Sequence, residues 1–332
     1  MNNKKSLLSV LILVLVMIFF SCEKSEIPED PLLLIPSDSS LLFQIKLKDI
    51  LNTEAVKKLR EKGAIPTKAI NEIKERLNID PFQDVESAIF ALWSVNPPNG
   101  ILLIKGNFNE QKIIETLKKE NVNMKEEKYK YFTVYSIAEK ENPFAFSFLN
   151  WHNILVSANP INVKKSIDTT FVKKKERKNI YDNETMKKLM LKLDFTSQIY
   201  GAADLKPLLS AYPVFAQSEF LNAIFALKID PNNLISKITI DFTGPTKAQD
   251  FKTAFDQSLS QLGSNPATYQ FYPIVANSIK STLAGNSVIV DINLTKDNLD
   301  QLAEISKSIS PTVTPGAPTP STPTPPAPTG NN

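Results

Sequence analysis

The feature that most constrains the fold is a weak repeat between the two halves of the chain. Phe90-Ala91-Leu92 recurs 135 residues later as Phe225-Ala226-Leu227, and a turn and an apolar segment follow in both places. At the same offset, Asn153-Ile154-Leu155-Val156 lies opposite Val288-Ile289-Val290-Asp291. Matches that recur in one order indicate a degenerate duplication, in which each copy repeats the same structural unit.

A third match has a longer offset and locates a difference between the copies. Leu47-Lys48-Asp49-Ile50-Leu51 resembles Leu205-Lys206-Pro207-Leu208-Leu209, 158 residues later. The 23 additional residues fit an extra helix in the first copy, at about residues 67–78.

Hydrophobic periodicity assigns a type to the repeated pieces. Apolar residues alternate with polar or small ones over 43–47, 144–148, 237–242 and 288–294, which predicts strands with one wet face in mainly antiparallel sheet. Apolar residues at helical spacing predict helices over 113–117, 163–167, 248–262 and 299–305. We therefore expect an α+β fold of two degenerate repeats, each with its helices packed on one face of the sheet.

The first 21 residues are typical of a targeting segment rather than of a folded domain. Lys4 and Lys5 precede a fifteen-residue apolar stretch, 6–20, which is shorter than the ~20 residues of a membrane span. The stretch ends in Phe19-Phe20-Ser21-Cys22, which contains the single cysteine of the chain.

This ending resembles the lipobox of bacterial lipoproteins, although two phenylalanines stand where that motif has leucine and a small residue. The resemblance implies cleavage before Cys22 and its modification by diacylglycerol and an N-acyl chain such as palmitate. The membrane would then be a partner through these acyl chains, and the protein would lie in the bacterial cell envelope, at the inner or the outer membrane. The alternatives are an ordinary secretory leader and an uncleaved anchor.

The composition changes along the chain predict its organisation. Residues 311–332 hold eight Pro and six Thr with no charge, so they cannot form a core. The predicted parts are a signal peptide (1–21), the lipidated Cys and a tether (22–36), a first α+β repeat (37–172), a basic linker (173–181), a second α+β repeat (182–309) and a disordered tail (310–332).

The start of the predicted body resembles certain uncharacterised bacterial envelope proteins. The resemblance rests on Leu34-Ile35-Pro36-Ser37-Asp38-Ser39-Ser40, an alternating strand and Lys48-Asp49-Ile50-Leu51. It implies a location rather than an activity.

The residue composition argues against several classes of catalytic and binding site. His152 is the single histidine and is predicted to lie exposed in a hairpin turn, so we expect no multi-histidine metal site. No two glycines are closer than six residues, which removes the phosphate-binding loops of nucleotide sites. Without residues 1–21 the chain has 36 basic and 35 acidic residues, so its net charge gives no positive electrostatic potential that would attract nucleic acid. We therefore expect no enzyme, no cofactor and no nucleic-acid partner.

One segment carries more apolar residues than its local structure needs. These residues either fill a core between two sheets or line a hydrophobic groove between the halves. The groove candidates are Leu208, Leu209, Tyr212, Phe215, Phe220, Leu221 and Phe271. The leading interpretation is a non-catalytic, lipid-anchored module that binds a macromolecular partner, and the alternative is a carrier or sensor of an apolar ligand such as an acyl chain or a lipid.

Overall fold

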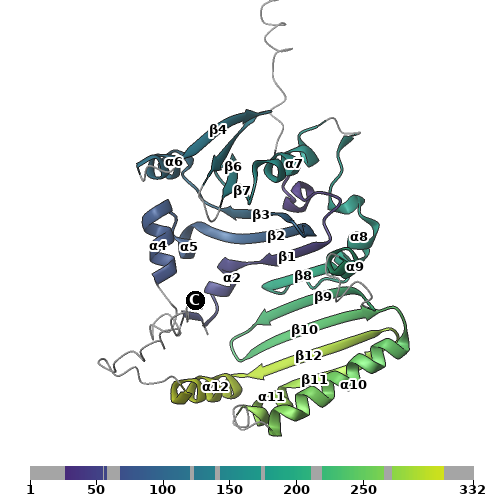
Figure 1. Ribbon diagram of the computed structural model, residues 1–332. Helices are drawn as coiled ribbons and strands as arrows, with labels where there is room; N and C mark the ends of the chain where they lie inside the picture. The colour runs from purple at the N-terminus through teal and green to yellow at the C-terminus, as the bar shows by residue number, and fades with distance from the viewer. Residues whose placement is uncertain are drawn as a thin grey trace, which may run out of the picture.

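A single antiparallel sheet runs through the described part of the chain (Figure 1). The computed structural model describes residues 27–54, 56–57, 68–119, 123–138, 143–172, 176–210, 219–264 and 271–309. Its strands are β1 (Leu41–Ile45), β2 (Val85–Val95), β3 (Pro98–Gly106), β4 (Met124–Tyr129), β5 (Phe132–Ile137), β6 (Phe144–Asn150), β7 (Asn153–Ser157), β8 (Ile199–Asp204), β9 (Phe220–Ile229), β10 (Asn233–Phe242), β11 (Ile279–Ala284) and β12 (Ser287–Thr295). The α+β class is thus present, but the two sheets assumed in one interpretation are one.

Helices connect and cover these strands. They are η1 (Pro31–Leu34), α2 (Leu47–Leu51), α4 (Lys68–Leu77), α5 (Pro81–Asp84), α6 (Glu110–Lys119), α7 (Pro160–Thr170), η3 (Ile180–Asp182), α8 (Glu184–Met190), α9 (Leu205–Ser210), α10 (Pro245–Gln261), η5 (Leu262–Ser264), α11 (Tyr272–Ser278) and α12 (Lys296–Ile309). The extra helix expected at about 67–78 corresponds to α4.

The order of the strands is the same on both sides of the sheet's centre. The full order is β11-β12-β10-β9-β8-β1-β2-β3-β7-β6-β5-β4, with β1 and β8 side by side. Moving outward, β1-β2-β3-β7-β6 on one side corresponds to β8-β9-β10-β12-β11 on the other, and the first half adds β5 and β4. Phe90 lies in β2 and Phe225 in β9, so the strongest sequence match falls on strands at corresponding places.

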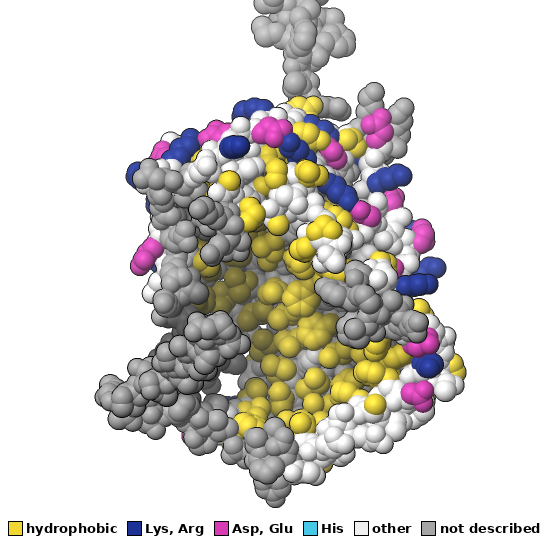
Figure 2. Space-filling model, in the orientation of Figure 1, with side chains coloured by type: hydrophobic (Ala, Val, Ile, Leu, Met, Phe, Trp, Pro, Cys, Tyr) yellow, Lys and Arg dark blue, Asp and Glu magenta, His cyan; other side chains and the backbone are white. Residues whose placement is uncertain are grey.

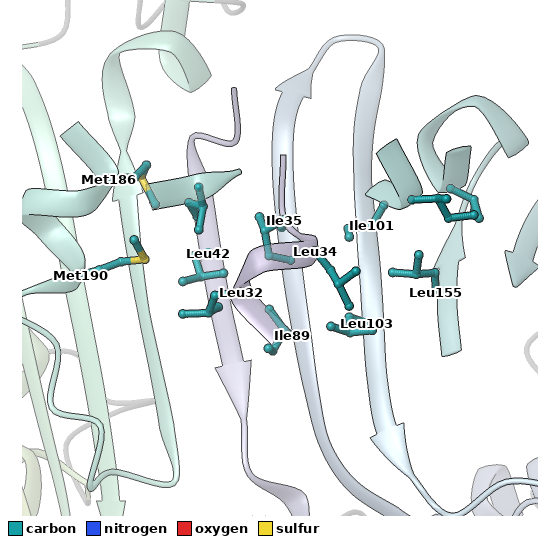
Figure 3. Packing of buried hydrophobic residues seen from close by; sticks show 14 of the residues in the cluster. Leu32, Leu34, Ile35, Leu42, Ile89, Ile101, Leu103, Leu155, Met186 and Met190 are labelled. Atoms are coloured by element: carbon teal, nitrogen blue, oxygen red, sulfur yellow. The ribbon is translucent and has the colours of Figure 1, made fainter. Parts of the chain in front are cut away.

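One face of the central strands is deeply buried, and we call it the covered face. Leu42 of β1 is 0% exposed and Ile89 of β2 is 2% exposed. Helices η1, α7, η3 and α8 contribute to the same hydrophobic cluster, and Figure 3 shows η1 lying across the strands with Leu32 and Leu34 directed at the sheet. This cluster is the main core of the molecule.

Sequence features explain why η1 forms where it does. Asp30 caps it by accepting a hydrogen bond from the backbone N–H of Leu32, and Pro31 occupies its first turn. The helix and the residue after it bury Leu34 and Ile35 at 1% and 0% exposure. Part of the predicted tether, 22–36, is therefore built into the core.

The predicted basic linker is also partly structural. Asn179 pairs with Pro36 in an isolated β-bridge, and its side chain caps η3. Ile180 is fully buried in the main core. Residues 173–175 of the linker, the tail from 310 onward, the signal peptide (1–21) and the start of the tether (22–26) lie outside the described residues.

The prediction that helices pack on one face is wrong for the first half. Ile154 and Leu155 are neighbours on β7 and therefore point to opposite faces. Leu155 packs in the main core with α7, whereas Ile154 packs in a second cluster with α6. Ala145 and Ser147 of β6, expected on a wet face, are 0% exposed. Periodicity shows that a helix has an apolar side, but it does not show which face of a sheet that side meets.

The second half has a different arrangement, with α10 on the face opposite the main core. Phe251 and Phe255 of α10 pack with Phe242, Val288 and Val290 in a third cluster. The other face of these strands carries polar side chains, namely Lys237, Thr239, Asp241 and Asp291.

Two adjacent leucines of β1 test the difference between the faces. Leu42→Ala should lower the free energy of unfolding by about 3 kcal/mol, because it leaves a cavity in the main core. Leu41→Ala should cost clearly less, because Leu41 lies on the opposite face and is only partly buried. Denaturant unfolding of both variants measures the difference, and equal losses would contradict this assignment of the faces.

Candidate functional site

The face of the central strands opposite the main core, which we call the open face, is apolar over six strands. Cross-strand register aligns one residue of each strand in a row, and two further rows flank it. The middle row is Leu102, Phe90, Phe43, Gly201, Phe225 and Ile238, and the flanking rows are Ile104, Ala88, Ile45, Ile199 and Leu227, and Leu92, Leu41, Ala203, Ala223 and Ile240. We call the surface made by these three rows the trough.

The trough is only partly shielded from water. Phe90 is 38% exposed, and Phe43, Phe225 and most other members are half-buried. Figure 2 shows hydrophobic side chains gathered in a hollow over the central strands. Leu42, Ile89 and Ala91 belong to the same strands but face the main core at 0–2% exposure. The difference in burial therefore comes from the helices above each face and not from the strands.

The hollow follows from how the helices are distributed. On the open face, α6 packs at the β5–β6–β7 side and α10 at the β10–β12 side. Between them, α2 and α9 contact β2 and β9, but these helices have five and six residues. At ~1.5 Å rise per residue each is roughly 8–9 Å long, which is too short to cover strands of about ten residues.

Gly201 shapes the floor of the trough at its centre. A Cβ atom at this position would lie 2.7 Å from the backbone oxygen of Leu42 and 2.9 Å from Cδ2 of Phe43. The missing side chain lets Phe43 and Phe225 lean across β8 and stack with ring centroids 6.1 Å apart. The two halves of the molecule thus meet through an aromatic pair.

The trough has no titratable side chain in its three rows. Nearby groups with shifted pKa values are on strand β8 but at positions that alternate with the trough residues. Burial raises the pKa of Tyr200 to about 12, and its hydroxyl donates a hydrogen bond to Oε1 of Gln44 at 2.6 Å. Burial also raises the pKa of the Asp204 carboxyl. Neither group offers acid–base chemistry to a ligand in the trough.

The dimensions of the trough suit an extended hydrocarbon chain. Six strands at ~4.8 Å spacing span roughly 24 Å. One leaflet of a bilayer with a hydrocarbon core of ~30 Å holds chains about 15 Å long. An acyl chain can therefore lie across the strands within the trough.

Five of the seven predicted groove residues are among the described residues, and they lie in α9, in β9 and just before α11. Leu208 is buried in α9 and Leu209 is half-buried there, whereas Phe220 packs on Phe242 and Phe251 beneath α10. The other two described candidates are Leu221, in β9, and Phe271, just before α11. Tyr212 and Phe215 lie outside the described residues. The strands of the described residues form one sheet, so within that part of the chain these residues do not fill a core between two sheets.

Sequence reasoning missed the residues that do form the trough. In the sequence analysis Phe43 contributed only to the prediction of a strand. Phe90 and Phe225 contributed only to the prediction of a repeat. A usable signal was present in β2, where Ala88 to Leu92 is apolar at every position. A strand that is apolar on both faces needs cover on both faces or leaves one of them exposed.

His152, predicted to be an exposed turn residue, has a structural role. It lies in the turn between β6 and β7, is half-buried, and its Nδ1 is 2.8 Å from the carbonyl oxygen of Gly106. Within the described ranges, no group of three or more His, Cys, Asp and Glu side chains is placed to hold a metal ion. Among the same residues, no helix has the length and apolarity needed to span a membrane.

Comparison with known proteins gives similarity at the level of structure. No family model matches the sequence, and no curated protein matches it. Crystal forms I and III of TP0453 resemble the chain with a TM-score of 0.46 at 12% identity, and the likeness covers 85% and 86% of this chain and 98% and 100% of TP0453. Form IV gives a TM-score of 0.41 at 11% identity, over 83% of this chain and 96% of TP0453. A likeness at this level carries no argument about function.

Gly201 and Gly244 form a matched pair for testing the floor of the trough. Gly201→Ala should lower the free energy of unfolding by about 1–3 kcal/mol, because the new methyl group collides with the backbone of β1. Gly244→Ala should cost clearly less, since nothing lies within 4 Å of its added Cβ and it loses only the preference for glycine over alanine at the N-cap of α10. Thermal or denaturant unfolding checks both, and a harmless Gly201→Ala would show that β1 and β8 are not so closely packed.

Proposed function

We propose that this chain is a non-catalytic, lipid-anchored envelope protein that carries or senses an apolar ligand, an acyl chain, in its trough. The observation that carries the proposal is the unequal burial of the two faces of the same strands. Leu42 is 0% exposed on one face, whereas Phe90 is 38% exposed on the other. Exposed apolar surface collected in one hollow is typical of a binding site.

The chemistry of the trough favours a hydrocarbon chain over a folded protein partner. Protein interfaces combine an apolar centre with a polar rim and hydrogen bonds between the partners. The three rows of the trough consist of aliphatic residues, phenylalanine, alanine and glycine, and the register adds Ser236 of β10 beside Leu227 at the end of one row. The rows therefore offer mainly van der Waals contact, with few directional bonds. Each methylene removed from water contributes ~0.8 kcal/mol, which is enough for an acyl chain to bind without polar contacts.

The proposed anchor is Cys22, the single cysteine of the chain. One acyl chain alone gives marginal membrane binding, and the lipobox modification would supply three. The mature protein would then remain attached to one membrane of the cell envelope while the trough handles a ligand from the same lipid environment.

We also infer that the two halves arose by duplication of one α+β unit. The common outward strand order and the positions of Phe90 and Phe225 in β2 and β9 support this inference. In each half a strand is followed by a short helix, α2 after β1 and α9 after β8. The trough would then lie across the junction of the two copies.

Polar substitutions in the trough test ligand binding. Phe90→Gln combined with Phe225→Gln should weaken the binding of a fluorescent fatty acid by about tenfold or more, because hydrophobic contact is lost at the centre of the trough. Mass spectrometry should also find less co-purified lipid with this variant than with the unmodified protein.

The matched control is Leu191→Gln, a loss of apolar surface at a residue that is 81% exposed and outside the trough. This variant should keep full affinity. If the trough variant remains folded by circular dichroism and binds fatty acid as well as the control, the assignment of the site is wrong.

The anchor is tested separately in a bacterial expression host. Cys22→Ala should abolish incorporation of radiolabelled palmitate and move the protein out of the membrane fraction, because no other thiol can accept diacylglycerol. Ser21→Ala is the control, since it keeps a small residue before the cleavage site and should leave labelling unchanged. An unchanged membrane fraction for Cys22→Ala would contradict lipid anchoring.

A further inference from the structure

The turn between β6 and β7 presents an aromatic side chain to solvent from a rigid base. Trp151 is 60% exposed, and its ring lies against that of His152. The backbone N–H groups of Phe108 and Gly106 donate to the carbonyl oxygens of Trp151 and His152, both at 2.8 Å. Asn150 closes the turn by accepting the backbone N–H of His152 through Oδ1 at 2.8 Å. The backbone of this turn is therefore fixed, whereas the indole of Trp151 is free to contact another surface.

A second exposed aromatic residue lies on the neighbouring turn. Tyr131 is 69% exposed and sits between β4 and β5. Strand β5 pairs antiparallel with β6, with Tyr135 opposite Phe146, so the turn before β5 and the turn after β6 lie at the same end of the sheet. The two turns belong to adjacent hairpins, and we call Tyr131 and Trp151 the aromatic tips.

The N-terminal segment reaches the body beside this end of the sheet. Ile27 and Glu29 line a pocket of about 300 Å³ together with Asn150, His152 and Asn153. Ile27 also packs against the main core. Five residue steps separate Cys22 from Ile27, and whatever conformation they take, they span at most ~18 Å.

The length of this connection limits where the body can lie. A cysteine anchored in a bilayer keeps Ile27 within ~18 Å of the attachment point, and the turn that carries Trp151 is next to Ile27. Trp and Tyr side chains favour the boundary between headgroups and hydrocarbon, because their rings are apolar and carry a polar group.

We propose that the aromatic tips rest in the interface of the bilayer that holds Cys22, so that they seat the body on its membrane in one orientation. This inference rests on the proposed lipid anchor. The charged residues near the tips are of both signs: Lys130, which precedes Tyr131, is paired with Asp168, and Glu29 and Glu86 line the neighbouring pocket with Lys105. We therefore expect the contact to be made by the aromatic rings, without dependence on anionic headgroups.

The two tryptophans of the chain allow a direct test. Trp93 lies near the opposite end of β2, partly buried against the main core, with Nζ of Lys165 4.4 Å from its ring centroid. Trp93→Phe leaves Trp151 as the single tryptophan of the full-length lipoprotein. In phosphatidylcholine vesicles its emission should shift to shorter wavelength, and lipids brominated near the headgroup should quench it more than lipids brominated near the chain end.

The control is Trp151→Phe, in which Trp93 is the remaining source of tryptophan fluorescence. Its emission should be unaffected by brominated lipid, because Trp93 lies away from the aromatic tips. Flotation of the vesicles shows separately that the protein is attached.

The outcomes separate the two proposals. If the lipoprotein floats but Trp151 is not quenched, the body is not seated through the aromatic tips, and lipid anchoring stands. If quenching disappears at high salt, the contact is electrostatic and the proposal is wrong. If the protein does not float at all, the anchor itself is refuted, and the proposed orientation is refuted with it.

Discussion

The structure depends on strands that are apolar on both faces but covered on only one. In the centre of the sheet, Leu42, Ile89 and Ala91 face a core built by η1, α7, η3 and α8. The alternate residues Phe43, Phe90 and Phe225 face a hollow. Burial of the first set stabilises the fold, and that stability allows the second set to remain partly in contact with water. Stability and the candidate function thus come from opposite faces of the same strands.

The meeting of the two halves places this hollow at the middle of the molecule. β1 and β8 pair directly, and the glycine between Phe43 and Phe225 lets residues from both halves share one surface. The longer helices lie farther out, over the clusters around Ile154 and Val288. Because the first strand of one half pairs with the first strand of the other, the trough contains residues of both halves.

The proposed anchor and the trough would serve the same chemistry. A protein attached to a membrane through acyl chains would work where apolar ligands are concentrated, and a trough without charged side chains in its rows is suited to such ligands. The aromatic tips lie at one end of the sheet, and the residues on either side of Trp151 line a pocket together with Ile27. Membrane seating and ligand binding would then use separate surfaces, which can be changed independently.

Much of the fold was open to prediction from the sequence. Strand alternation at Ile238 and Val288 and the helical stripe of α10 follow from hydrophobic period, which depends only on local geometry. A helix at the position of α4 was predicted from the difference between the 135-residue and 158-residue offsets of the repeat. The helix assignment to one face failed because the apolar residues of β6 and β7 face both sides, and a residue's neighbours in the chain do not reveal which helix will cover it.

The residues of the candidate site could not be predicted from the sequence for the same reason. The sequence by itself determined that the chain has strands and helices, and it led us to propose two similar halves and a membrane anchor, because each of these depends on the spacing of residues along the chain. Only the tertiary structure decided that Phe43, Phe90 and Phe225 form one surface, since that depends on the pairing of β1 with β8 across more than 150 residues. Whether an apolar residue is core or site depends on what lies above it, and that is a property of the assembled sheet and helices.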